Sequence, residues 1–232
     1  MKIYGAGSLE DIRQSVELGV AGILTNPQGF DQYYHGEMTL EEITRAIMEL
    51  TDLRVFIQIH GESAEALVAR ARELHRISPQ VGFKIIANEK GFRAIAALQR
   101  EGIDCIATTL FTVAQAAVAA SAGAFGICPF VSRAAAIGMD PSAILRTVRA
   151  GYDRLERAPE IIAVSMKSVA DVEAALGAGA DAVGMRYPLI REMMTHPLSD
   201  RAELLFGRNW ANVKGENVGY LVDGMRLEGI AE

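Results

Sequence analysis

The chain has 232 residues, a formal net charge of −6 and a hydrophobic fraction of 50%. This length suits one α/β barrel of about 250 residues, and the apolar content excludes a disordered chain. Two cysteines without a CxxC motif exclude a disulfide scaffold and a zinc module, and the acidic balance argues against a nucleic-acid partner. The N-terminus has no apolar signal core, and no apolar run approaches the roughly 18 residues of a membrane span. We therefore expect a cytoplasmic protein with no membrane contact.

Short apolar runs alternate with amphipathic segments along the chain. The predicted strands are 2–6, 22–26, 54–60, 82–87, 104–108, 125–130, 160–166 and 182–187. Helix-like segments separate them, and some begin at a capping serine, such as Ser8 or Ser168, with an aspartate three positions on. Strict alternation predicts a parallel sheet, and eight strands are the number that closes a (β/α)8 TIM barrel. A doubly wound sheet is the alternative, but the GAG at 5–7 does not complete its usual glycine-rich fingerprint.

The segment after the last predicted strand differs from the rest of the chain. A short helix candidate at 189–197 is followed by a partly apolar tail at 198–232, which contains Phe206 and the single tryptophan, Trp210. Neither a linker nor a second domain boundary is evident. We therefore predict one barrel domain over 1–232, with a C-terminal helical tail that packs on the barrel or on a neighbouring subunit.

Alternation along each strand sorts the side chains that face the barrel interior, and barrel enzymes place their chemistry at the carboxyl ends of the strands. Along the seventh strand, the predicted interior residues are Ala163, Ser165 and Lys167, and Ile162 and Val164 are expected to face the helices. The polar residues placed inside are Asn26, Gln58, His60, Lys84, Thr108, Ser165 and Lys167, with Arg133 just beyond the sixth strand. Leu24, Cys128 and Phe130 share the interior side of their strands.

These interior residues restrict the chemistry. No pair of carboxylates is among them, which disfavours glycosidase chemistry, and no His, Asp or Glu cluster offers a metal three ligands. We therefore expect neither a metal nor a cofactor. An inward lysine in an apolar wall has a lowered pKa, and its neutral amine attacks carbonyls, so Lys84 predicts Schiff-base chemistry. The alternatives are that Lys84 is a structural lysine paired with a carboxylate, that His60 is a core histidine, and that Arg133 and Lys167 are solvated rim charges.

Five segments in order resemble those of the transaldolase family, in particular its short subgroup that includes fructose-6-phosphate aldolase. They are LTNPQ (24–28), FIQIH (56–60), GFKII (82–86), ICPFVSR (127–133) and AVSMKS (163–168), and each lies at the end of a predicted strand.

The resemblance implies an α/β barrel in which Lys84 condenses with a ketose carbonyl. It implies that Gln58 and Thr108 hold a proton-shuttling water and that Asn26 binds hydroxyls of the dihydroxyacetone unit. Phe130 would wall the site, and the phosphate of a sugar-phosphate substrate would be bound by Arg133, Ser165 and Lys167. It also implies a homo-oligomer, a pentamer or decamer, in which a C-terminal helix reaches a neighbour.

This sequence departs from the family pattern on the donor side. Ala6 stands where the family's first strand carries an aspartate, and Leu24 replaces the first threonine of the T-T-N-P segment. The proline that usually follows two residues after the lysine is also missing. Losing a positioned acid or base costs on the order of 10²–10⁴ in rate. Either the donor is less hydroxylated or larger than dihydroxyacetone, or His60 replaces the missing acid.

Three functional hypotheses follow. The first is a cofactor-free class I aldolase or transaldolase, for which Phe130 favours transfer and Gln58 favours simple cleavage. The second is a sugar-phosphate-binding barrel without carbon–carbon chemistry, which the absent aspartate supports. The third is a deoxyribose-phosphate-type aldolase, against which the LTNP and PFVSR segments count.

Overall fold

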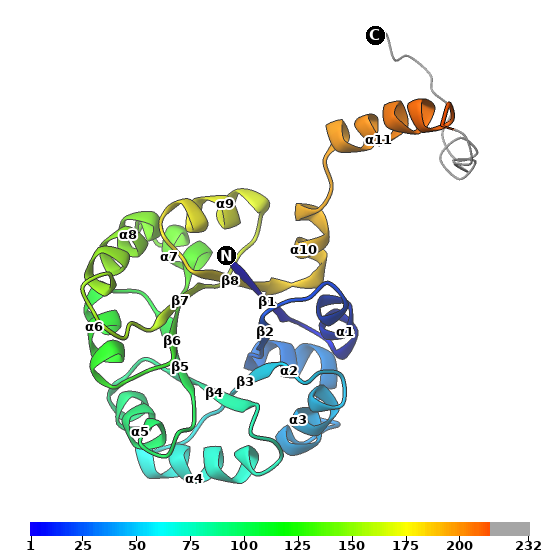
Figure 1. Cartoon of the computed structure of the whole chain (residues 1–232). Coiled ribbons are helices and arrows are strands. Elements are labelled where there is room, and N and C mark those ends of the chain that lie inside the picture. Colours follow the sequence, from blue (N-terminus) through cyan, green and yellow to red (C-terminus); the bar gives the residue numbers. More distant parts are fainter. Residues whose placement is uncertain (214–232) are drawn as a thin grey trace. The chain divides into compact units, whose positions relative to one another are not determined.

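A computed structural model describes residues 1–213 and shows a closed barrel of eight parallel strands (Figure 1). The strands are β1 (Lys2–Ala6), β2 (Gly22–Leu24), β3 (Arg54–Gln58), β4 (Val81–Ile86), β5 (Cys105–Leu110), β6 (Gly126–Pro129), β7 (Glu160–Ala163) and β8 (Ala182–Arg186). They follow one another around the ring in chain order, and β8 closes on β1. The prediction of a (β/α)8 TIM barrel is confirmed. We call the end of the barrel at the carboxyl ends of the strands the mouth.

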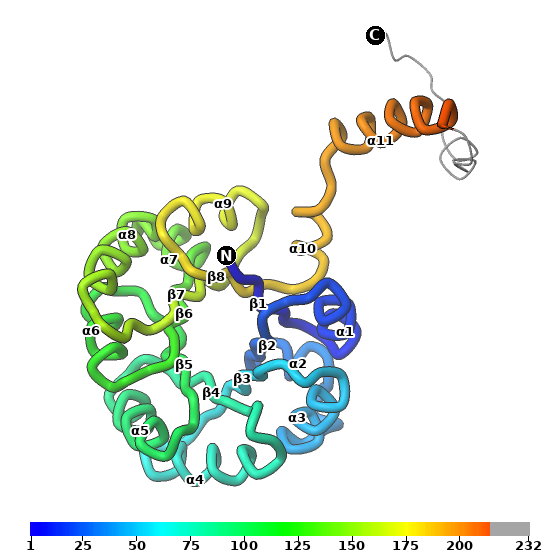
Figure 2. Tube along the Cα trace, in the orientation of Figure 1, coloured from blue at the N-terminus to red at the C-terminus, as the bar shows by residue number. Residues whose placement is uncertain are grey.

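Helices cover the outside of the ring, as the tube in Figure 2 shows. They are α1 (Leu9–Glu17), α2 (Pro27–Tyr34), α3 (Leu40–Met48), α4 (Ala64–His75), α5 (Glu89–Gln99), α6 (Val113–Ser121), α7 (Val131–Ala136), α8 (Pro141–Tyr152) and α9 (Val169–Gly177). The predicted caps at Ser8 and Ser168 are confirmed, because each serine side chain accepts a hydrogen bond from the backbone N–H of the aspartate three positions on. Six of the eight strands end earlier than predicted, and in β2 the reason is that Asn26 already caps α2.

The chain divides into two compact units, Met1–Ile190 and the segment from Arg191 onward. The first unit holds the barrel. Helix α10 (Tyr187–Met193) spans the division, and the second unit contains α11 (Pro197–Trp210), which begins near the start of the predicted helical tail. The predicted tail residues 214–232 lie outside the described residues. In the described part of the chain, no helix is long and apolar enough to cross a membrane.

The barrel interior is filled by side chains from alternate strand positions, as a packed barrel core requires. The buried interior cluster consists of Tyr4, Leu24, Phe56, Ile106, Cys128, Ile162, Val164 and Ala182. Gly184 makes room for this cluster, because a Cβ there would lie 2.6 Å from Leu24 Cδ1 and 3.0 Å from Val164 Cγ1. Leu24 and Val164 therefore both pack over Gly184. This side of the interior, below the mouth, is apolar.

The predicted alternation in β7 is wrong. Ile162 and Val164 belong to the interior cluster, whereas Ala163 takes the other face of the strand. The sequence could not predict which residues of β7 face the interior, because Ile161 to Val164 are all apolar and all buried. The alternation then breaks at Ser165, whose φ of 66° lies in the left-handed region.

The amino-terminal end of the barrel is closed by polar contacts. The Tyr4 hydroxyl donates to Glu160 Oε2 over 2.7 Å, and Lys2 pairs with the same carboxylate at 3.0 Å. Arg54 pairs with Asp104 nearby. Because these charged groups pair with one another, we expect the reactive groups of the interior at the mouth.

Candidate active site

Lys84 is held inside the barrel by β4, with only 4% of its surface exposed. Its Nζ donates a hydrogen bond of 2.9 Å to the carbonyl oxygen of Thr25, and no carboxylate pairs with it among residues 1–213. Burial lowers the pKa of the Lys84 amine, because an ammonium group loses its hydration inside the barrel. The alternative of a lysine paired with a carboxylate therefore fails within the described residues. The site presents a buried amine that is biased toward its neutral, nucleophilic form.

Thr25 positions this amine, and the sequence analysis missed it. Its carbonyl accepts from Lys84, and its Oγ1 accepts a 2.9 Å hydrogen bond from the Gln58 backbone N–H. The same hydroxyl donates to the carbonyl oxygen of Phe56. Alternation alone places Thr25 away from the interior, so the only available signal was that it directly follows β2, at the mouth.

Two further polar side chains lie in the buried interior with Lys84. Thr108 and Cys128 are neighbours across β5 and β6, and neither side chain is exposed. The Thr108 hydroxyl forms no hydrogen bond with a nitrogen or oxygen atom of the described residues, and its neighbour is the Cys128 thiol, a weak partner. Burial raises the pKa of the Cys128 thiol to about 11, and the nearby Lys84 opposes that shift. The site thus contains an amine, a hydroxyl and a thiol, all three buried.

The other predicted residues on the lysine side lie closer to solvent. Gln58 is the register neighbour of Lys84 and is half-buried. His60 is exposed, so it is not a buried core histidine. Asn26 is also exposed, and its side chain accepts a 2.8 Å hydrogen bond from the Gly29 backbone N–H as the cap of α2.

Phe130 and Arg133 form a contact at the ends of β6 and α7. The Phe130 ring packs partly against the interior cluster, and the Arg133 guanidinium lies 5.0 Å from its centroid. A cation over an aromatic face is held electrostatically by the ring. Arg133 itself is exposed, which leaves its donors accessible.

Asp171 joins the loops that carry the remaining predicted anion-binding residues. Its Oδ2 accepts from the Lys167 backbone N–H over 2.8 Å and from the Ser132 hydroxyl over 2.9 Å. This one carboxylate therefore connects the β7–α9 loop to α7. The Lys167 side chain is exposed, whereas Ser165 is half-buried.

Arg186, at the end of β8, is a second mouth residue that the sequence analysis missed. Its Nη1 donates a 2.7 Å hydrogen bond to the hydroxyl of Tyr33 in α2. The signal was available, because Arg186 is the first charged residue of its strand and shares the side of Ala182 and Gly184.

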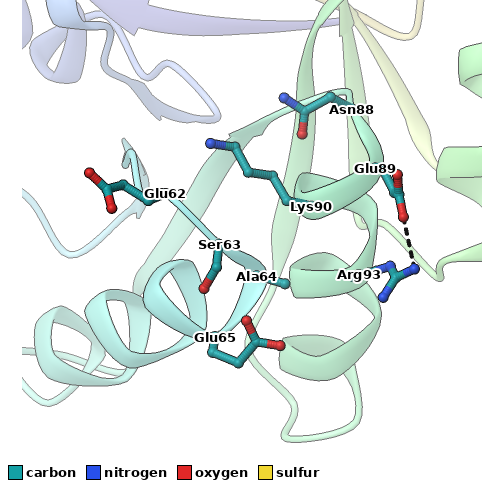
Figure 3. A pocket seen from close by; sticks show the side chains of 8 residues that line it. All are labelled: Glu62, Ser63, Ala64, Glu65, Asn88, Glu89, Lys90 and Arg93. Carbon is teal, nitrogen blue, oxygen red and sulfur yellow. Dashed lines mark hydrogen bonds and ion pairs between the residues drawn. The ribbon is translucent and has the colours of Figure 1, made fainter.

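A separate pocket of about 490 Å³ opens between the loops that precede α4 and α5 (Figure 3). In it Lys90 donates to the Gly61 carbonyl over 2.6 Å, and Arg93 pairs with Glu89 at 2.8 Å. Lys84 and the other predicted site residues do not line this pocket. Because none of the predicted site residues lines it, this pocket is distinct from the candidate active site.

Among residues 1–213, no group of three His, Cys, Asp or Glu side chains is placed to hold a metal ion. The arrangement at the mouth instead provides a nucleophilic amine, a polar position for water and a set of cations. Such a site can carry out covalent chemistry on a carbonyl compound that bears an anionic group.

Solved structures of low sequence identity share the barrel. A putative phosphonomutase from Burkholderia cenocepacia J2315 aligns with a TM-score of 0.61 and 17% identity, over 87% of this chain and 92% of that one. A structure titled "Native KDPGal structure" aligns with a TM-score of 0.55 and 12% identity, over 96% and 90% of the two chains. These similarities show the fold alone.

Sequence relatives are more specific. A "Probable transaldolase" from Streptococcus equi subsp. zooepidemicus (strain MGCS10565) is 34% identical over 216 residues, which are 92% of this chain and 100% of that protein. Another "Probable transaldolase", from Heliobacterium modesticaldum (strain ATCC 51547 / Ice1), is 32% identical over 90% of this chain and 96% of its own length. The family model described as "Transaldolase/Fructose-6-phosphate aldolase" matches residues 7–225. The chain therefore belongs to the transaldolase/fructose-6-phosphate aldolase family.

Proposed function

We propose that this protein is a class I aldolase or transaldolase that cleaves or transfers a three-carbon ketone unit from a ketose phosphate or a similar anionic sugar. The observation that carries the proposal is Lys84, a buried lysine without a carboxylate partner in the described structure, whose pKa is lowered by burial. Such an amine is largely neutral at lower pH than a solvated lysine, and a neutral amine is what carbonyl addition requires.

The proposed reaction begins when the Lys84 amine adds to the ketone and water leaves, which gives a protonated imine. The substrate hydroxyl beyond the bond to be cleaved then loses its proton, and the carbon–carbon bond breaks. Its electron pair moves into the imine to form an enamine on Lys84, and an aldehyde is released. The enamine is then protonated and hydrolysed by water, or it attacks an acceptor aldehyde.

Gln58 and Thr108 are the groups we assign to the water that carries these protons. Thr108 offers a buried hydroxyl that lacks a nitrogen or oxygen partner among the described residues, and a water molecule would supply one. Gln58 adjoins Lys84 in the strand register, so its amide is placed on the same side of the mouth as the amine. His60 is the candidate for the acid that Ala6 cannot supply.

Arg133, Ser165 and Lys167 are proposed to bind the phosphate of the aldehyde half. This assignment is supported by the positions of Arg133 and Lys167, which are exposed cations just beyond the ends of adjacent strands. Barrels often bind phosphate at such positions. Asp171 would hold this grouping together through Ser132 and the Lys167 backbone. Phe130 would wall the site beside Arg133, and Asn26 would bind donor hydroxyls.

We also propose that the protein forms a homo-oligomer through α11. This helix exposes Leu198, Phe206 and Trp210, with exposed fractions of 66%, 60% and 52%. Large apolar side chains grouped on one helix commonly mark an interface.

The test of the proposed function is a product assay with a panel of ketose phosphates and other anionic sugars, including sugar acids, with and without an acceptor aldehyde. Cleavage releases a free aldehyde, whereas transfer yields a new ketose only when the acceptor is present. The matched variants are Lys84→Met, which should abolish both products, and Lys90→Met, which should leave both unchanged. If ligands stabilise the protein against heat but neither product forms with any substrate, the chain is a sugar-phosphate-binding barrel instead.

A further inference from the structure

Arg186 begins at the interior side of the mouth. In β8, Ala182 belongs to the interior cluster, and a Cβ on Gly184 would meet Leu24 and Val164. Because side chains alternate along a strand, Arg186 leaves the backbone on the same side as these two residues. It is the last residue of its strand, so its side chain lies at the mouth.

The Arg186 side chain crosses the end of β1. Its backbone is paired with that of Ala6, yet its Nη1 reaches the hydroxyl of Tyr33, which lies in the helix that follows β2. The strand order β8–β1–β2 therefore places β1 between the two ends of this contact (Figure 1). At the crossing, β1 contributes only the methyl side chain of Ala6.

The positive charge of Arg186 is not neutralised by any carboxylate within ion-pair distance in residues 1–213. This differs from Arg54 and Arg149, each of which pairs with an aspartate in the barrel. Tyr33 takes one of the five N–H donors of the guanidinium. The exposed remainder of the group is available to an anion.

The Arg186 guanidinium and the Lys84 amine both donate hydrogen bonds to one short segment of the chain, residues 25–33. Lys84 donates to the carbonyl of Thr25, and Arg186 donates to Tyr33, eight residues along the chain. Below them, Ala6 and Leu24 offer no hydrogen bond from their side chains. The Thr25 hydroxyl is already engaged by the neighbouring strand backbone. Besides the Asn26 amide, an oxygen-rich substituent bound here would find the Arg186 guanidinium, the charged donor of this part of the mouth.

We infer that Arg186, positioned by Tyr33, binds a carboxylate on the donor half of the substrate, so that the three-carbon ketone unit is a 2-oxo acid. This inference rests on the proposed function of Lys84. A carboxylate matches a guanidinium through two parallel charge-assisted hydrogen bonds, which a hydroxymethyl group cannot form. In the covalent step the Lys84 amine replaces the ketone oxygen, which leaves as water, and the carboxylate keeps its charge.

The test measures formation of the Lys84 adduct with three probe ketones: pyruvate, hydroxyacetone and dihydroxyacetone. The imine is trapped with cyanoborohydride, and the adduct is quantified by mass spectrometry as a function of ketone concentration. For the wild type, we expect half-maximal trapping at a lower concentration of pyruvate than of either hydroxyketone. Arg186→Gln should raise the pyruvate concentration required by about 10-fold or more while changing that for hydroxyacetone by less than about 2-fold.

Two further variants complete the design. Tyr33→Phe should weaken pyruvate trapping by less than Arg186→Gln does, because it frees the guanidinium without removing it. Arg93→Gln makes the same chemical change at an arginine in α5, which pairs with Glu89, and should leave the trapping of all three ketones unchanged.

The outcomes separate this inference from the proposed function. Adducts with the hydroxyketones but weaker trapping of pyruvate would overturn the carboxylate site and leave the Schiff-base chemistry intact. An equal effect of Arg186→Gln on all three ketones would also overturn it. If no ketone forms an adduct at Lys84, both the proposed function and this inference are wrong.

Discussion

Lys84 is buried inside the barrel, and the hydrogen-bond partner of its amine is a neutral carbonyl oxygen, not a carboxylate. The hydrogen bond to Thr25 stabilises either protonation state only modestly, whereas burial penalises the charged form. In the folded protein the amine therefore binds a proton less tightly than in the unfolded chain. This difference makes stability depend on pH.

Lys84→Met tests that dependence. In the pH window between the lowered folded-state pKa and about 10.4, the unfolded chain binds more protons, so wild-type stability rises with pH. Below both pKa values the penalty is fully present. We expect the variant to be more stable than wild type near pH 7 by about 1 kcal/mol or more, which corresponds to roughly 2–4 °C in Tm, and this gain should shrink as the pH approaches 10.

Thermal unfolding across pH 6–10 measures this effect, with Lys90→Met as the control. Lys90 also donates to a backbone carbonyl, but it is exposed, so its substitution should produce little pH-dependent change. A Lys84→Met variant that is less stable than wild type at every pH would contradict the assignment of a penalised amine.

At the level of the element, α2 begins at a residue that caps the helix and that we also propose to bind the substrate. Asn26 is the N-cap of this helix through its contact with Gly29, and Pro27 begins the first turn. The same helix supplies Tyr33, the partner of Arg186. A change at the cap therefore acts on the mouth even if Asn26 never touches the substrate.

Two substitutions separate these roles. Asn26→Ala removes the cap and should lower the free energy of unfolding by about 1 kcal/mol, whereas Asn26→Ser retains a capping oxygen and should cost much less. If the Asn26 amide also binds the substrate, Asn26→Ser should raise KM while its stability stays near that of wild type. Denaturant unfolding and steady-state kinetics provide the two readouts. A stable Asn26→Ser variant with unchanged kcat/KM would restrict Asn26 to its structural role.

For the whole molecule, the barrel was predictable from the sequence because eight apolar runs alternate with helical segments and each run must find a parallel neighbour. The strand positions of Lys84, Gln58 and Thr108 were predictable because each polar residue follows clearly apolar residues in its strand. The error in β7 arose where Ile161 to Val164 are apolar on both faces. Thr25 was missed because its contacts join segments far apart in the sequence, and alternation within one strand carries no information on such contacts. Alternation does place Arg186 on the interior side of its strand, but its contact with Tyr33 joins segments far apart in the sequence and could not be predicted.

The apolar side chains of α11 lead to a prediction about assembly. Phe206→Glu places a charge on an exposed apolar residue and should reduce the solution mass of the proposed oligomer, because burying an unpaired charge at an interface is unfavourable. Asn209→Glu adds the same charge at an exposed polar residue of the same helix and should have a smaller effect. Light scattering coupled to size-exclusion chromatography gives the mass. A wild type that is monomeric at all concentrations would contradict the prediction.

The central claim is that Lys84 forms a covalent imine with a ketone substrate. The most direct measurement is reductive trapping with ketose phosphates and short ketones, followed by peptide mapping of the modified lysine. We predict a stable adduct on Lys84 that is absent from Lys84→Met and unaffected by Lys90→Met. An adduct on another lysine, or none across the panel, would contradict the account.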